Sequence, residues 1–225
     1  MRLDRGVSIK PCSLRAFYKK SKVGYYVANY QYQQAVARPQ WKVQEFAVAL
    51  ARLVQDKSIV VYTDESSFNM WIKMRSTWMN MDEPVKIILN KHRGNGITVI
   101  GAISEHLASP LFMLAKSTNS EDFMAFLKQL RNRFSYCKST AIHLVLDNAA
   151  AHHNNFVKLL AAKLKIELMF LPAYTPELNP IEALWGIIKR DFKQRLMQTK
   201  HIVKEQPQFR ELLQASLDAI TPEVQ

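Results

Sequence analysis

The chain has 225 residues, 48% of them apolar, and its 31 Lys and Arg against 19 Asp and Glu give a formal net charge of +12. This composition predicts one packed domain with a small appendage and argues against a disordered chain. No apolar run approaches the roughly 20 residues of a membrane span, and the first residues lack the apolar block of a secretory signal, so no membrane association is expected.

The positive charge is concentrated near the N-terminus. Residues 1–57 carry 11 Lys and Arg against 3 Asp and Glu, a net charge of +8. Such a basic arm is typical of proteins with a polyanionic partner, usually nucleic acid, although a solubility arm or a membrane surface is an alternative explanation. Cys12 and Cys137 form no CxxC pair. We therefore expect reduced thiols, with no disulfide framework and no zinc site.

In chain order, the first elements are helical. Residues 8–26 predict a short basic helix that stops at Gly24, and residues 27–40 a polar linker. Residues 41–57 place apolar side chains at the spacing of an amphipathic helix.

From residue 58 the pattern changes to short β-branched runs that alternate with amphipathic segments. An antiparallel start followed by strand–helix alternation predicts an α/β fold, with a mixed sheet and helices packed on both faces. The expected strands cover 58–65, 68–74, 96–104, 110–116, 141–148 and 166–172, and the expected helices cover 120–134 (with a Ser cap), 153–164, 179–198 and 207–220.

Two of these strands end in an aspartate, Asp64 or Asp147. In open α/β sheets, side chains that carry chemistry gather outside the strand ends. If the two strands are neighbours, the two carboxylates lie side by side, which is unfavourable unless one is protonated or a cation lies between them. Carboxylates without a His or Cys cluster favour Mg²⁺ or Mn²⁺. A turn-forming or capping role is the alternative for each aspartate taken alone.

A third carboxylate comes from Glu182. Asn179 is predicted to be the N-cap of the following helix, Pro180 its first residue and Glu182 its third, as in a capping box. Glu182 therefore either satisfies the backbone of its own helix or points toward a ligand. Gly186, Lys189 and Lys193 continue the Glu182 stripe along the helix, where Gly186 either clears space or allows close packing on the sheet. The lysines either meet phosphates or form a solvated face.

Five motifs in order resemble the Tc/mariner superfamily of DDE transposases and the related bacterial insertion-sequence enzymes. The spacing also resembles the Tc-like branch, because 34 residues separate Asp147 from Glu182. The motifs are VVYTDESSF (60–68), the tryptophan of RSTWM (75–79), ITVIGAIS (97–104), LVLDNAAAHH (144–153) and LPAYTPELNPIEALWGIIK (171–189).

The resemblance implies a ribonuclease-H-like fold in which Asp64, Asp147 and Glu182 bind two Mg²⁺ or Mn²⁺ ions. It implies metal-dependent DNA cleavage and strand transfer without a covalent protein–DNA intermediate. The expected partner is double-stranded DNA, namely terminal inverted repeats and a TA target, held by a homodimer on paired ends. The expected location follows the DNA: the nucleus in a eukaryote, the cytoplasm in a bacterium.

The family also implies helix-turn-helix units ahead of the catalytic domain. Residues 1–40 are expected to be a remnant of such a unit with its linker, and residues 41–225 the DDE catalytic domain. Expected DNA contacts are Lys189, Arg190, Lys193, His152, Lys19 and Lys20. For His152 the alternatives are a group that supports the metal ligands or the helix start. Trp78 and Trp185 are interpreted as core residues or as aromatics that cradle DNA.

Two other functions remain open from sequence. One is a catalytically inactive, transposase-derived DNA-binding protein, against which the presence of all three acids argues. The other is a ribonuclease-H-type nuclease acting on RNA–DNA hybrids, against which the Pro-rich segment 171–181 argues.

Overall fold

The computed structural model divides the chain into two compact units, Met1–Ala37 and Arg38–Gln225. The described part of the first unit contains helix α1 (Pro11–Lys20), which lies inside the predicted basic helix and begins with proline at its first position. Whether this unit is a DNA-binding remnant stays a prediction. The structure describes residues 10–20, 39–69, 96–115, 119–137, 139–198 and 206–220.

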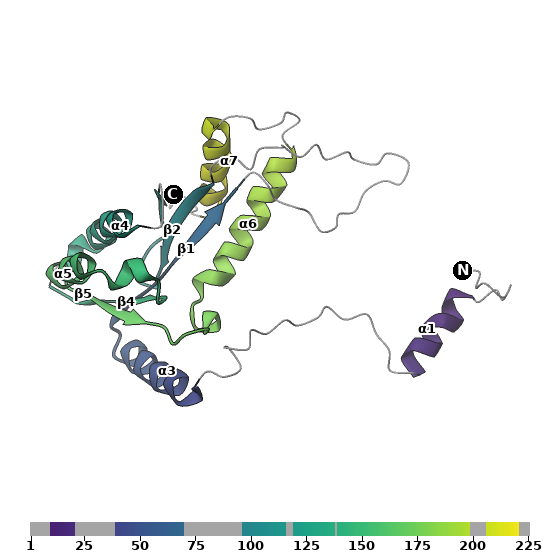
Figure 1. Ribbon diagram of the computed structural model, residues 1–225, viewed down its shortest axis with the longest axis horizontal. Helices are drawn as coiled ribbons and strands as arrows, with labels where there is room; N and C mark the ends of the chain where they lie inside the picture. Colours follow the sequence, from purple (N-terminus) through teal and green to yellow (C-terminus); the bar gives the residue numbers. More distant parts are fainter. Residues whose placement is uncertain are drawn as a thin grey trace. The chain divides into compact units, whose positions relative to one another are not determined.

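The second unit is built around a five-stranded sheet (Figure 1). Its strands lie in the order β3-β2-β1-β4-β5, with antiparallel pairing of β1 with β2 and of β2 with β3, and parallel pairing of β1 with β4 and of β4 with β5. The elements in chain order are α3 (Gln40–Gln55), β1 (Ile59–Phe68), β2 (Ile97–Ile103), β3 (Leu111–Ala115), α4 (Ser120–Arg133), β4 (Ile142–Leu146), α5 (Asn155–Lys163), β5 (Ile166–Phe170), α6 (Ile181–Gln198) and α7 (Gln206–Asp218).

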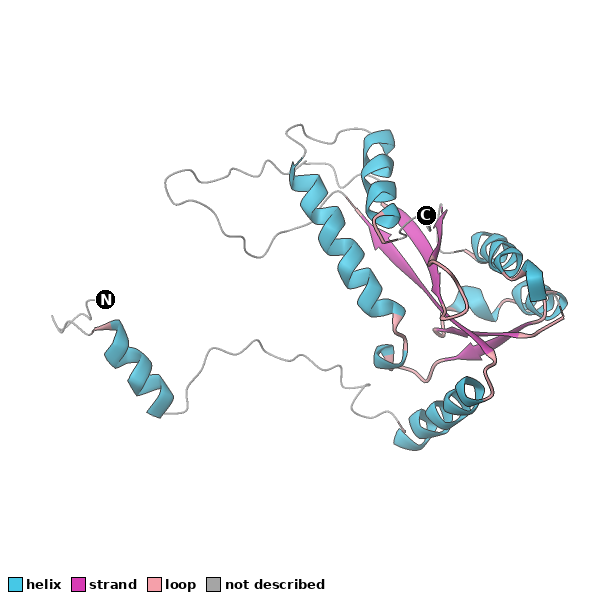
Figure 2. Ribbon diagram, turned by 180° about the vertical axis from the view of Figure 1, so that it is seen from behind, coloured by secondary structure: helices cyan, strands magenta, loops and turns pink. Residues whose placement is uncertain are grey.

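Helices cover both faces of this sheet, as predicted (Figure 2). On one face, α4 and α5 pack against alternate strand residues such as Val61 and Leu144. On the other face, α6 and α7 pack against the β1–β2 end through residues such as Trp185 and Phe192. Helix α3 lies on that second face as well, where partly buried side chains such as Phe46 contact a smaller apolar cluster. The mixed sheet between two helical layers confirms the predicted α/β architecture.

The register of the two central strands has a direct consequence for the acids. Tyr62 of β1 is paired with Val145 of β4 in the parallel ladder. This is the last pair of the ladder, and Asp64 and Asp147 each follow it by two residues, Asp147 in the loop after β4. The two strands are therefore neighbours, as the prediction about the two carboxylates required, and both acids lie beyond the same end of their ladder.

Some predicted boundaries differ from the structure. The strand predicted over 68–74 lies outside the described residues except for Phe68 and Asn69, and Phe68 is the last residue of β1. The Ser cap predicted for α4 is wrong, because the Asn119 side chain accepts the hydrogen bond from the Asp122 N–H at 2.7 Å. Ser120 is instead the first helical residue, and its hydroxyl donates to a backbone carbonyl near α5.

Among the described residues, no helix combines the length and hydropathy that crossing a bilayer requires.

Candidate active site

Asp64 lies in the middle of β1, half-buried beneath the start of α6. Its Oδ2 accepts a hydrogen bond of 3.0 Å from the indole Nε1 of Trp185. The indole is only 2% exposed and packs on β2 directly at Gly101, where a Cβ would lie 2.7 Å from the ring. Gly101 is also the ladder partner of Asp64. Because Gly101 has no side chain, the Trp185 indole can pack against β2 and donate its hydrogen bond to Asp64.

Asp147 follows β4 and is about half exposed. Its Oδ1 accepts a 3.0 Å hydrogen bond from the Ala149 N–H, so the chain turns tightly around the carboxylate. The same oxygen lies 3.2 Å from Nε2 of His152. The hydrogen bond from His152 is the main reason that the pKa of Asp147 is lowered, which keeps this acid ionised.

Glu182 lies in the first turn of α6 and is exposed. The predicted capping box is wrong in its details. The helix begins at Ile181, one residue after the predicted Pro180. The Asn179 side chain reaches across to β1, where its Nδ2 donates to the carbonyl of Thr63 at 3.1 Å. Its Oδ1 is buried without a hydrogen-bond partner among the described residues, so it does not cap the helix.

The Asn179 side chain therefore connects the segments that carry Asp64 and Glu182 and does not cap the helix. The bond links the residue before Asp64 to the start of the helix that carries Glu182. Only the Asn179 backbone carbonyl takes part in the first turn, accepting from the Glu182 N–H at 3.2 Å.

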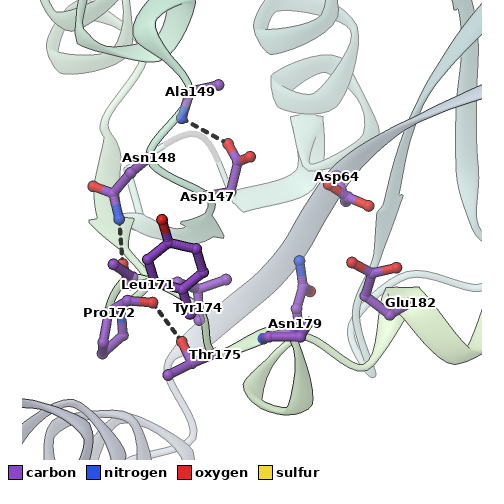
Figure 3. Close-up of a pocket in the computed structure, with 12 residues that line it drawn as sticks. Asp64, Asp147, Asn148, Ala149, Leu171, Pro172, Tyr174, Thr175, Asn179 and Glu182 are labelled. Carbon is purple, nitrogen blue, oxygen red and sulfur yellow. Dashed lines mark hydrogen bonds between the residues drawn. The ribbon is translucent and has the colours of Figure 1, made fainter. Parts of the chain in front are cut away.

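The three acids line one open cavity of about 480 Å³. Figure 3 shows the carboxylates of Asp64, Asp147 and Glu182 around a common space, each coming from a different element. Burial and then the nearby Glu182 and Glu65 raise the pKa of Asp64 to about 7. Such crowding of negative charge is unfavourable in the protein alone, and a bound cation would relieve it.

A second group of possible ligands shares Asp147 with the three acids. The ligand atoms of Glu65, Asp147 and His152 lie within 4.8 Å of one another. His152 is 2% exposed, and its Nε2 is 3.4 Å from Glu65 and 3.2 Å from Asp147. Burial lowers the pKa of this imidazole, but the two carboxylates outweigh burial and raise it to about 9.

The two groups differ in how well they suit a divalent cation. With a pKa raised to about 9, His152 is protonated at neutral pH and in that form cannot ligate a metal, and its single positive charge offsets one of the two carboxylates beside it. Asp64, Asp147 and Glu182 instead offer oxygen donors only, which is the ligand set that Mg²⁺ and Mn²⁺ prefer. The residues present therefore fit a hard divalent cation between the three acids, with His152 hydrogen-bonded to Asp147.

The basic residues of α6 line a second cavity of about 330 Å³ further along the same helix. It is bordered by the end of β1 and by Gly186, Lys189, Arg190 and Lys193. A Cβ at Gly186 would meet nothing within 4 Å, so the alternative of close helix–sheet packing at this glycine is wrong. The Lys189 ammonium lies 6.0 Å from the centre of the Phe68 ring, within reach of a cation–π interaction.

The remaining predicted contacts lie elsewhere. Lys19 and Lys20 are exposed in the last turn of α1, in the first unit. The burial of His152 favours the supporting role among the alternatives considered for it. Trp185 is a core residue that also contacts an acid, while Trp78 lies outside the described residues.

Three contributors to the site were not identified from sequence: Glu65, Gly101 and Tyr174. Glu65 directly follows Asp64, so its adjacency to the first acid was the available signal. Gly101 lies inside a predicted strand, where an isolated glycine signals a close approach of another group. Tyr174 lines the cavity with the acids, and nothing in the local pattern distinguishes it from other loop residues.

Comparison with known proteins agrees with this geometry. A profile described as DDE superfamily endonuclease matches residues 59–204. The Tc3 transposase of Caenorhabditis elegans is 28% identical over 153 residues, which cover 66% of this chain and 46% of that protein. The Tcb2 transposase of Caenorhabditis briggsae is 28% identical over 147 residues, which cover 60% of this chain and 52% of that protein. The chain thus spans about half the length of these relatives.

Solved structures identify the fold. The paired end complex of Mos1 mariner with Mn gives a TM-score of 0.62 at 14% identity, covering 94% of this chain and 64% of that one. The catalytic domain of Mos1 mariner transposase gives 0.55 at 13% identity, covering 86% of each chain. At such identities the likeness concerns the fold, which is ribonuclease-H-like, as the motifs implied.

Proposed function

Because this chain belongs to the family of DDE superfamily endonucleases, we propose that it is the catalytic part of a Tc-like transposase. The observation that carries the proposal is the convergence of Asp64, Asp147 and Glu182 on one cavity. The transposase relatives and the fold likeness support the same reaction class. The proposed activity is metal-dependent cleavage of DNA followed by strand transfer.

In this proposal the three carboxylates hold two Mg²⁺ or Mn²⁺ ions. When bound, these ions would stabilise the charge on the attacking and leaving oxygens of an in-line displacement at phosphorus. The surrounding residues keep the carboxylates in place: Trp185 fixes Asp64, and His152 fixes Asp147. The Asn179 amide ties the start of α6, and so Glu182, to β1. Such positioning matters because a metal site tolerates displacements of only about 0.5 Å.

The proposed reaction is a pair of displacements at phosphorus. Water first replaces the 3′ oxygen of one nucleotide, leaving a 5′-phosphate and a free 3′-hydroxyl. That hydroxyl then attacks a phosphodiester of the target, and the displaced target oxygen takes the proton.

The basic side of α6 is the proposed path of the DNA backbone. Lys189 and Lys193 follow Glu182 by seven and eleven residues on one helix, about 10 and 16 Å along its axis. Together with Arg190 they border the second cavity, where the phosphates on that side of the cleaved bond would meet positive charge. Lys19 and Lys20 of α1 are proposed to contact DNA independently of the basic residues of α6.

The resemblance extends the proposal to the whole assembly. The DNA partners are terminal inverted repeats and a TA target, and the protein acts as a homodimer on paired ends. Its location follows the DNA, in the nucleus of a eukaryote or the cytoplasm of a bacterium.

A nicking assay tests the activity. The purified chain is incubated with supercoiled plasmid carrying the genomic flanks of its gene, with Mg²⁺, Mn²⁺ or EDTA. We expect nicking with either metal, loss of nicking in EDTA, and a loss of at least a hundredfold in Glu182→Gln. Glu177→Gln is the matched control, because Glu177 is exposed five residues away and does not line the cavity.

Two outcomes would favour the other functions. Binding of this DNA without cleavage under any metal condition would indicate a catalytically inactive DNA-binding protein. Degradation of an RNA–DNA hybrid in place of duplex DNA would indicate a ribonuclease-H-type nuclease. Nicking retained in Glu182→Gln would refute the role of Glu182.

A further inference from the structure

The backbone of Tyr174 adopts a conformation that bulky residues avoid. Its φ of 59° lies in the left-handed region. Two other described non-glycine residues share this region, Lys57 and Lys165, and each follows the C-cap of a helix, where such a conformation is common. Tyr174 follows no helix, because it lies in the loop between β5 and the short turn that precedes α6. Its strained backbone therefore needs another explanation.

The surrounding loop holds Tyr174 in this conformation. The Thr175 hydroxyl is buried and donates to the Pro172 carbonyl at 2.6 Å. The Asn148 amide donates to the Leu171 carbonyl, and the Leu171 N–H donates to the end of β4 at 2.8 Å. Residues held in sparsely populated backbone regions by their surroundings cluster at functional sites.

The ring of Tyr174 is partly exposed in the cavity. It is 47% exposed and lines the same cavity as the three acids. In Figure 3 it lies on the side of Asn148 and Asp147, with Asp64 and Glu182 on the other side.

The loop that carries Tyr174 gives the cavity a mainly apolar lining. Its residues Leu171, Pro172, Ala173 and Pro176 line the cavity together with the polar Thr175, and Asn148 lies on the same side as the ring. None of the described residues that line this cavity is Lys or Arg, so this side of it offers no cationic partner for a phosphate. An exposed aromatic ring on an apolar wall is the arrangement on which nucleobases stack.

We propose that Tyr174 stacks on an unpaired nucleobase next to the phosphate that occupies the acidic site. The inference rests on the proposed function, because a phosphodiester that binds through the proposed divalent ions would carry a nucleoside on each side. A base inside an intact duplex is covered on both faces, whereas a base beside a strand break can turn one face to the ring. Tyr174 thereby selects frayed or nicked ends at the site.

The test uses a nicked duplex of about 30 base pairs, with 2-aminopurine as the base beside the nick and Ca²⁺ in place of Mg²⁺ to prevent cleavage. Stacking on tyrosine quenches 2-aminopurine fluorescence. Tyr174→Asn removes the ring but keeps a side chain that tolerates the left-handed backbone. Tyr174→Phe keeps the ring. Tyr136→Asn is the matched control, since Tyr136 is exposed and does not line the cavity.

Wild type, Tyr174→Phe and Tyr136→Asn are expected to quench the probe equally. Tyr174→Asn is expected to leave the fluorescence unquenched and to bind about 5- to 150-fold more weakly, the range that base–aromatic stacking supports. An abasic nucleotide beside the nick should weaken wild type by the same factor and leave Tyr174→Asn unaffected. Equal quenching by Tyr174→Asn, or no quenching by wild type, would overturn the proposal.

A nicking assay with Mg²⁺ separates this inference from the proposed function. If wild type quenches the probe but cleaves no DNA, the stacking role stands and the proposed enzymatic activity fails. If Tyr174→Asn cleaves intact and abasic substrates at wild-type rates, the stacking role fails and the proposed activity stands.

Discussion

Replacing Gly101 with alanine tests the packing that holds the first acid. The new Cβ would lie 2.7 and 2.8 Å from two carbon atoms of the Trp185 ring and 3.2 Å from Ile181. Ordinary carbon contacts are about 3.5–4.0 Å, so the indole must move by about 1 Å. It has little room, because it is buried and its ring also contacts Phe68 and Phe112.

The cost follows from three effects. Overpacking costs about 1–3 kcal/mol, and the rigid indole puts this site near the upper end of that range. Loss of the Trp185–Asp64 hydrogen bond adds about 1 kcal/mol. Replacement of glycine by alanine in a strand returns roughly 0.5–1 kcal/mol. We therefore expect Gly101→Ala to lower the free energy of unfolding by about 3 kcal/mol, or Tm by about 6–12 °C.

Urea and thermal unfolding measure this effect, and two variants serve as controls. Gly186→Ala should raise stability by about 1 kcal/mol, because its Cβ meets open space and alanine favours the helix. In a Trp185→Phe background the smaller ring should accept the new methyl group, so the penalty of Gly101→Ala should fall by more than half. The packing argument would be refuted if Gly101→Ala did not lower the free energy of unfolding, or if it lowered it equally in the wild-type and Trp185→Phe backgrounds.

Three further predictions concern the acids and the basic side of α6. Burial and neighbouring carboxylates raise the pKa of Asp64 from 3.8 to about 7. The stability that its proton provides is thus lost as pH rises from about 4 to about 7, and Asp64→Asn should remove that part of the pH dependence in metal-free urea unfolding. An unchanged pH profile in Asp64→Asn would contradict this. Asn179→Ala removes the hydrogen bond to the Thr63 carbonyl and should lower the free energy of unfolding by about 1 kcal/mol in the same assay; an unchanged free energy of unfolding would argue that this bond does not hold α6 to β1. Changing Lys189 and Lys193 to Gln should make the slope of log K for DNA binding against log[salt] shallower by about 2. An unaltered slope would mean that the DNA backbone does not contact these lysines.

The convergence of the three acids on one cavity follows from simple rules, whereas their role as metal ligands stays a prediction. Asp64 and Asp147 each close an apolar run, and both follow the last residues of the parallel β1–β4 ladder. The prediction that Asp64 ends its strand is wrong, because β1 continues to Phe68 in its pairing with β2. Glu182 was placed at a helix start, where it is found. Strand and helix periodicity likewise gave the order of the elements, and the family match confirms the resemblance that five motifs indicated.

The supporting contacts could not be predicted in the same way. Asn179 has the local pattern of a helix cap, but its amide bonds to Thr63, which is 116 residues away in sequence. The indole N–H of Trp185 similarly reaches an acid 121 residues distant. Such contacts depend on how the layers pack, and a local pattern carries no information about them. The left-handed backbone conformation of Tyr174 could not be predicted from the sequence either, because the loop imposes a conformation that tyrosine does not prefer.

The most direct test of the central claim is to map the metal site with iron. Fe²⁺ bound in place of Mg²⁺ generates hydroxyl radicals in the presence of ascorbate and peroxide, and mass spectrometry identifies where the backbone is cut. We predict cuts around residues 64, 147 and 182 that excess Mg²⁺ suppresses and that Glu182→Gln abolishes. Cutting centred on residue 152 and unchanged by Glu182→Gln would contradict the three-acid site and point to Glu65, Asp147 and His152 as the ligands.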